Sequence, residues 1–150
     1  MSHTATSHRP ADAGQALLSV RGLNAWYGES HALHGVDLDI ASGETITLIG
    51  RNGVGKTTTL RAIMGIIPKR TGTIRFDGRD MMPVPLHRTA HHGIGFVPEE
   101  RGIFASLTVE ENLTLPPVVG KGGMTLDEIY DLFPNLHERR ASGGTKLSGG

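Results

Sequence analysis

The sequence contains no cysteine, which excludes disulfide bonds and thiolate metal sites. It has no excess charge of either sign, because 15 Lys and Arg residues balance 15 Asp and Glu residues. Nucleic-acid backbones are bound chiefly by excess positive charge, so no nucleic-acid partner is expected. No apolar run is long enough to cross a membrane, and the N-terminal residues lack the apolar core of a signal peptide. We therefore expect a soluble, cytosolic chain.

One motif, at the end of the first third of the sequence, is typical of a specific kind of binding site. Residues 50–57 read Gly-Arg-Asn-Gly-Val-Gly-Lys-Thr, which matches the phosphate-loop pattern G-x-x-x-x-G-K-[ST]. Glycines let successive backbone N–H groups surround an anion, and the following helix directs its positive end at the phosphates. In this pattern Lys56 reaches the β- and γ-phosphates, and the Thr57 hydroxyl coordinates Mg²⁺. The alternative is a glycine-rich turn that contains Lys-Thr by chance.

Periodicity and turn residues predict mixed strands and helices on both sides of this loop. Alternating apolar residues indicate strands, and three- or four-residue spacing before a terminal glycine indicates helices. The expected elements are strands at 17–27, 36–40, 45–49 and 94–97, a hairpin arm at 72–76 before the turn residues Asp77-Gly78, and helices at 56–64 and 86–92.

The last third of the chain is predicted to be mainly helical. Thr108 with Glu111, and Thr125 with Glu128, have the spacing of capping boxes that begin helices. Between them, residues 116–123 are rich in proline and glycine and are expected to form a flexible loop.

Three further sites have residue types that can contact a nucleotide. Tyr27 ends the first predicted strand, where its ring can stack on adenine. Glu99 and Glu100 follow the strand at 94–97 and can bring a carboxylate to Mg²⁺ or to the attacking water. Residues 147–150 offer a hydroxyl and glycine N–H groups to phosphate. The alternatives are a tyrosine that packs on its own turn, a solvated acidic pair and a linker.

Together these residues resemble the nucleotide-binding subunit of ATP-binding-cassette (ABC) transporters, from about residue 17 to residue 150. The resemblance implies ATP and Mg²⁺ as cofactors, with residues 50–58 as the Walker A loop and residues 147–150 as the start of the signature sequence. It implies Lys56 and Glu99 as catalytic residues and Thr57 and Glu99 as metal ligands. The implied nucleotide-binding residues are Tyr27, Gly50, Asn52, Gly53, Gly55, Lys56, Thr57, Thr58, Ser148, Gly149 and Gly150.

Residues 95–104 and 107–113 look like the Q-loop region of the branch that imports branched-chain amino acids, with urea and amide importers close by. Residues 132–140 strengthen this similarity. Most members of the family have glutamine at the position of Glu99, and glutamate there is similar to the amino-acid branch.

The resemblance implies an α/β P-loop NTPase fold with a RecA-like core, an antiparallel β subdomain and a helical subdomain, incomplete at the C-terminus. Residues 1–16 are expected to be a disordered leader. Residues 17–98 are expected to form the N-terminal part of the ATP-binding core, and residues 99–150 the Q-loop and part of the helical subdomain.

The resemblance also implies a two-chain mechanism, in which ATP lies between the Walker A loop of one ATPase subunit and the signature sequence of a second, identical or related one. The other implied partners are integral membrane permease subunits and, indirectly, a periplasmic or extracellular solute-binding protein. The subunit is then attached to the inner face of the cell membrane through the permease. The family's Walker B aspartate, catalytic glutamate and switch histidine cannot be assigned within residues 1–150, so we expect these residues alone to be inactive in hydrolysis.

Other functions remain open at this point. An ABC-type ATPase that serves a ribosome or DNA machine, or a nucleotide-binding fragment without hydrolytic activity, has the same loop. A soluble P-loop kinase or GTPase has it too, but a GTPase needs a guanine-specific Asn-Lys-x-Asp element, and the sequence contains none.

Overall fold

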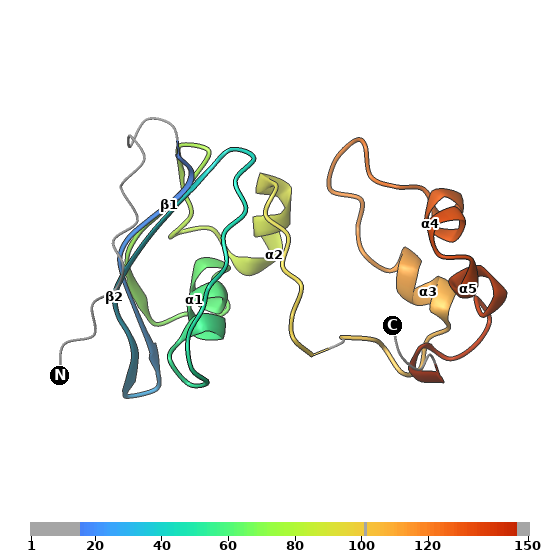
Figure 1. Cartoon of the computed structure of the whole chain (residues 1–150), viewed down its shortest axis with the longest axis horizontal. Helices are drawn as coiled ribbons and strands as arrows, with labels where there is room; N and C mark the ends of the chain where they lie inside the picture. The colour runs from blue at the N-terminus through green and yellow to red at the C-terminus, as the bar shows by residue number, and fades with distance from the viewer. Residues whose placement is uncertain (1–15, 101, 147–150) are drawn as a thin grey trace. The chain divides into compact units, whose positions relative to one another are not determined.

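The computed structural model describes residues 16–100 and 102–146 (Figure 1). By its contacts the chain divides into two compact units, one ending at Ile94 and the other beginning at Gly95. The expected leader at residues 1–16 lies outside the described residues, except that Ala16 begins the first strand. The functional boundary between residues 98 and 99 stays a prediction.

The first unit contains one antiparallel sheet. Its strands are ordered β2-β1-β3-β4, where β1 is Ala16–Tyr27, β2 is Ser30–Ala41, β3 is Arg70–Phe76 and β4 is Arg79–Asp80. The predicted strand at 17–27 and the predicted hairpin arm at 72–76 are confirmed. The strand predicted at 36–40 is longer and begins at Ser30, because the turn at residues 28–29 pairs Tyr27 directly with Ser30.

The two helices predicted in this unit are confirmed. Helix α1 (Lys56–Ile63) follows the glycine-rich loop. Helix α2 (Leu86–Thr89) continues as the 3₁₀ turn η1 (Ala90–His92), which ends at Gly93 with φ 90°. A glycine takes this left-handed conformation without steric cost, so it ends the helix where the sequence predicts.

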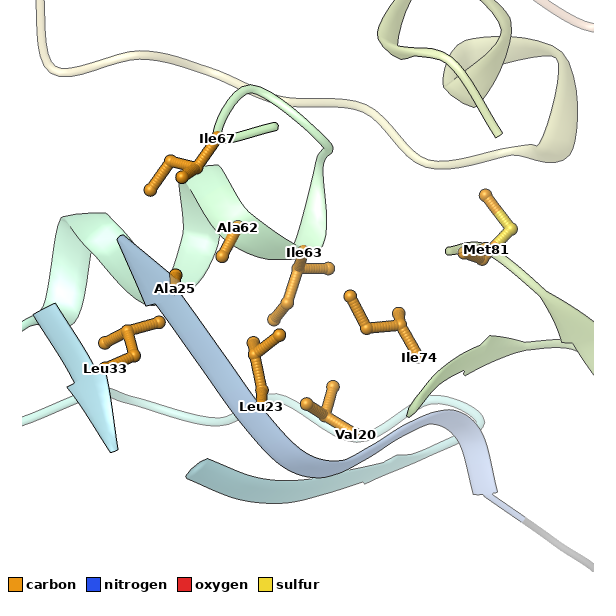
Figure 2. Close-up of a cluster of buried hydrophobic side chains, with 9 residues drawn as sticks. All are labelled: Val20, Leu23, Ala25, Leu33, Ala62, Ile63, Ile67, Ile74 and Met81. Atoms are coloured by element: carbon orange, nitrogen blue, oxygen red, sulfur yellow. The ribbon is translucent and has the colours of Figure 1, made fainter. Parts of the chain in front are cut away.

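The core of the first unit lies between helix α1 and the sheet (Figure 2). Leu23 and Val20 from β1 and Ile74 from β3 are fully buried, and Ala62 and Ile63 of α1 cover them. Burying a side chain of the size of leucine or isoleucine stabilises a fold by about 1.5–3 kcal/mol. The alternation of apolar residues along β1 therefore gives the sheet one face on which the helix can pack.

The predictions of strands at 45–49 and 94–97 are wrong. Neither segment has regular structure, and Ile49 and Val97 are 90% and 93% exposed. A strand in the interior of a sheet exists only where neighbouring strands accept its hydrogen bonds. Among the described residues, no strand pairs with either segment. The sheet that does form is the antiparallel one, as expected for the β subdomain.

The second unit is built from short helices, as predicted. These are α3 (Val109–Thr114), α4 (Leu126–Leu132), α5 (Pro134–Glu138) and the 3₁₀ turn η2 (Gly144–Lys146). Both capping boxes are confirmed. At the first, Thr108 Oγ1 accepts from Glu111 N at 3.2 Å, and Thr108 N donates to Glu111 Oε2 at 2.8 Å. Thr125 and Glu128 repeat this exchange at 3.3 and 2.7 Å.

The capping boxes make α3 and α4 sensitive to acid. Hydrogen bonds from Thr108 and Thr125 lower the pKa of Glu111 and Glu128 from the ordinary 4.5. The folded-state pKa lies below the unfolded one, so the stabilisation is complete above about pH 4.5 and is lost as pH falls through the lowered folded-state pKa. The double variant Glu111→Gln, Glu128→Gln is expected to have less helical circular dichroism than the wild type at pH 7. The difference should vanish at pH 2.

The control for this titration is Glu138→Gln, at the last position of α5 and away from any helix N-terminus. It should not lower the helical signal at pH 7, because a negative charge at the C-terminal end of a helix does not stabilise the helix. Equal pH profiles for the wild type and the double variant would contradict the capping argument.

Candidate functional site

The glycine-rich loop reverses direction through two left-handed glycines. Gly53 has φ 83° and Gly55 has φ 103°. A Cβ added to Gly55 would lie 3.0 Å from Leu33 Cδ2, so the loop is packed closely against strand β2. At the loop entrance, a Cβ added to Gly50 would lie 2.8 Å from Val54 Cγ1. Glycine is favoured for its backbone conformation at residue 53, for space at residue 50, and for both reasons at residue 55.

The N-terminal end of α1 is suited to an anion. Its N-cap, Gly55, supplies no side-chain hydrogen bond, and the first turn contains no acidic residue. The Gly55 carbonyl accepts from Thr59 N at 2.8 Å, but the N–H groups of the first turn have no acceptor within a helix. These N–H groups and the positive end of the helix dipole favour a negatively charged ligand.

Lys56 lies over the loop that precedes it. Its Nζ donates to the carbonyl oxygens of Gly50 at 2.7 Å and Arg51 at 2.9 Å. The ammonium group is thus held by two neutral acceptors, in the same loop as Asn52 and Thr57, whose side chains are exposed. The structure brings together the predicted site residues of the loop, from Gly50 to Thr58.

Tyr27 belongs to the same unit as this loop. It ends β1 in the hairpin that also carries Leu33, the contact of Gly55, and its side chain is 48% exposed. The next ring in the hairpin, Trp26, stacks on His31 with centroids 4.4 Å apart and an interplanar angle of 9°. A solvent-accessible tyrosine ring is available for stacking, and its role stays a prediction.

The remaining predicted residues belong to the second unit or lie outside the described residues. Glu99 and Glu100 belong to the second unit, where they are exposed and outside any helix or strand. Ser148, Gly149 and Gly150 lie outside the described residues. Within the described ranges, no group of three or more His, Cys, Asp or Glu side chains is arranged to hold a metal ion.

The sequence patterns do not single out Arg70, although it contacts the far end of α1. Its guanidinium group donates through Nη1 to the carbonyl oxygen of Ala62 and through Nη2 to that of Met82 at 3.2 Å. No sequence motif distinguishes Arg70 from its neighbour Lys69. A partly buried guanidinium is recognised only from the structure.

Comparison with solved structures gives the class of protein. A structure described as the ATP binding subunit of an ABC transporter aligns with 88% of this chain, at a TM-score of 0.68 and 30% identity, and 56% of that chain is covered. The glycine-rich loop before α1 and the antiparallel sheet beside it are parts of a P-loop NTPase fold of this type.

The family follows from the sequence comparison. The family model described as ABC transporter matches residues 33–150, which is most of the chain. The chain belongs to the ABC transporter family, in the group of its ATP-binding proteins.

Two curated relatives are similar to the same extent. The high-affinity branched-chain amino acid transport ATP-binding protein BraG of Pseudomonas aeruginosa is 36% identical over 89% of the chain and 59% of its own length. The lipopolysaccharide export system ATP-binding protein LptB of Escherichia coli K12 is 36% identical over 90% of the chain and 58% of its own length. The chain thus spans between half and three fifths of the relatives it matches. No helix in the described ranges is long and apolar enough to cross a membrane.

The two loop glycines give a matched pair of substitutions. Gly53→Ala adds a methyl group into open space, so its cost is backbone strain of about 1–2 kcal/mol. Gly55→Ala adds the same kind of strain and a collision with Leu33, and is expected to lose more free energy of unfolding. Urea unfolding of the two variants measures the difference, and equal losses would show that Leu33 moves aside at no cost.

Proposed function

We propose that this chain is the ATP-binding part of a transporter ATPase, and that residues 50–58 hold the triphosphate of Mg-ATP. The observation that supports this is the uncapped N-terminal end of α1 with the Lys56 ammonium group beside it. Backbone N–H groups of Gly53, Gly55 and Lys56 donate to phosphate oxygens. The Thr57 hydroxyl, which is exposed at the start of the helix, coordinates Mg²⁺.

Lys56 changes partners when the nucleotide arrives. Its two present acceptors, the carbonyl oxygens of Gly50 and Arg51, are neutral. Hydrogen bonds between an ammonium group and a phosphate are charge-assisted and stronger than bonds to neutral carbonyls. The β- and γ-phosphates therefore draw Nζ away from the loop carbonyls, and the lysine neutralises charge on the group that is transferred in hydrolysis.

Glu99 and the residues from Ser148 to Gly150 complete this proposal. Glu99 supplies a carboxylate for Mg²⁺ or the attacking water. Ser148, Gly149 and Gly150 contact the nucleotide held by a second ATPase subunit. Hydrolysis then needs two chains together with the family's Walker B aspartate, catalytic glutamate and switch histidine. The 150 residues alone are expected to bind Mg-ATP without turnover.

The transported solute is proposed to be a branched-chain amino acid or a related amide or urea compound. The similarity to BraG and the Q-loop pattern of residues 95–104 support import of this kind. The subunit then works at the inner face of the membrane, bound to permease subunits that receive solute from a binding protein outside the membrane. Export is the second candidate, since LptB has the same identity over a similar share of the chain. A non-transport ABC ATPase is a third.

A deletion experiment separates these candidates. Deleting the coding sequence in its own organism is expected to reduce uptake of labelled leucine and to leave lipopolysaccharide at the cell surface unchanged. Expression of the gene from a plasmid should restore uptake, and expression with Lys56→Ala should not. Unchanged uptake of leucine, urea and amides would contradict the import proposal, and a defect in lipopolysaccharide would favour export.

Removing the Lys56 ammonium group tests the nucleotide site directly. Lys56→Ala is expected to weaken Mg-ATP binding by about 1.5–3 kcal/mol, which is the range for a hydrogen bond to a charged group. Isothermal titration calorimetry measures the affinity. Lys121→Ala, in the exposed loop of the second unit, is the control and should bind like the wild type. Equal affinities for the wild type and Lys56→Ala would contradict the proposed site.

The role of Tyr27 is tested by separating the base from the phosphates. Stacking of an aromatic ring on a base contributes about 1–3 kcal/mol. Tyr27→Ala is expected to lose this amount of affinity for Mg-ATP, while Tyr27→Phe keeps it. Neither variant should change the affinity for inorganic triphosphate, which has no base. A loss of triphosphate binding in Tyr27→Ala would show that the residue supports the hairpin rather than the adenine.

A further inference from the structure

Arg70 joins three elements of the first unit. It is the first residue of β3, where its backbone pairs with Ala25 of β1. Its side chain leaves the sheet and donates to the carbonyl oxygen of Ala62 in the last turn of α1. The same guanidinium group donates to the carbonyl oxygens of Met82 at 3.2 Å and Met81 at 3.5 Å, in the segment after β4.

The end of α1 is shaped to receive this side chain. Gly65 has φ 80° and donates its N–H to the Ala62 carbonyl at 3.1 Å, while Ile66 N donates to Arg61 O at 2.9 Å. These two bonds form a Schellman motif, in which glycine is the favoured residue. A Cβ on Gly65 would lie 3.0 and 3.2 Å from Nη1 and Nη2 of Arg70, so the guanidinium group occupies the space that a larger residue would fill.

The positive charge of Arg70 is stabilised by carbonyl oxygens at the end of α1 rather than by a carboxylate. In the described part of the chain, no carboxylate forms an ion pair with it. Burial lowers the pKa of the guanidinium group from its ordinary range, yet an arginine in a protein keeps its charge. The carbonyl oxygens at the C-terminal end of a helix carry a partial negative charge, which stabilises a cation placed there.

Hydrophobic contact alone does not fix where α1 lies along the sheet. Ile63 lies beside Leu23 and Ile74, as Figure 2 shows, but the free energy of apolar burial has little directional dependence. The planar guanidinium fork is directional, because each N–H must point at its carbonyl acceptor. Ala62 and Lys56 lie on one short helix, about 9 Å apart along its axis, so fixing one end also fixes the other.

We propose that Arg70 is a positioning residue for the nucleotide site: by holding the C-terminal end of α1 against β3 and the Met81–Met82 segment, it places the phosphate loop at the other end of the helix. This inference rests on the proposed function of the loop. Arg70 itself touches no nucleotide, and it acts through α1.

Two substitutions distinguish the effect of the positive charge of Arg70 from the effect of its planar pair of N–H donors. Arg70→Lys keeps the positive charge and loses the planar pair of donors, and Arg70→Met loses both. Arg75→Met is the matched control, because Arg75 is an exposed arginine on the same strand. Val20→Ala is a second control, since Val20 is fully buried in the same core and its truncation lowers stability without touching the fork.

Amide hydrogen exchange of the 150-residue chain is the first measurement. In Arg70→Met and Arg70→Lys, exchange of the hydrogen-bonded helix amides at residues 59–64 is expected to be on the order of tenfold faster, while exchange in β1 is unchanged. Arg75→Met should match the wild type, and Val20→Ala should speed exchange over the whole unit. Wild-type exchange at residues 59–64 in both Arg70 variants would overturn the proposal, whether or not the chain binds ATP.

Calorimetry with Mg-ATP is the second measurement, made at a temperature where each variant is folded. Affinity is expected to fall about tenfold in Arg70→Met and less in Arg70→Lys, and to be unchanged in Arg75→Met. If Arg70→Met shows faster exchange but wild-type affinity, the arginine is only structural and the proposal is overturned. If the wild-type chain itself binds no Mg-ATP, the proposed function fails, and the exchange data alone decide whether Arg70 positions α1.

Discussion

The packing of helix α1 against one face of the antiparallel sheet is the contact on which the candidate site depends. The phosphate loop begins after a segment without regular structure, so α1 and the Gly55 contact with Leu33 are its anchors among the described residues. Apolar burial of Ala62 and Ile63 supplies the attraction. Hydrogen bonds from Lys56 at the N-terminal end of the helix and from Arg70 at its C-terminal end are directional, and they restrict the geometry at each end.

Local sequence signals predict local structure well in this chain. The Thr-x-x-Glu spacing finds the starts of α3 and α4, and Asp77-Gly78 finds the β3–β4 hairpin, because each feature is stabilised by residues close in sequence. The segments around Ile49 and Val97 have the composition of strands but lie exposed. An interior strand is defined by its neighbours, and its own residues cannot show whether neighbours are present.

The candidate site likewise has one part that the sequence predicts and another part that it does not predict. The loop from Gly50 to Thr58 is a contiguous motif, so sequence alone predicts its residues and the helix that follows it. Arg70 is separated from this motif in sequence and is brought to α1 only by the pairing of β3 with β1, which no short pattern encodes. The identity of any transported solute is less accessible still, because a phosphate-loop motif carries no information about a solute. BraG and LptB, whose names describe the transport of different compounds, are equally similar to this chain.

The stacked pair of Trp26 and His31 gives the molecule an intrinsic optical reporter. Trp26 is the single tryptophan of the sequence, so all indole fluorescence comes from the end of strand β1 in the β1–β2 hairpin. Its ring is adjacent in sequence to Tyr27 and is stacked on the imidazole ring of His31. Emission from this chain therefore reports on the local state of one hairpin, without a dye or a label.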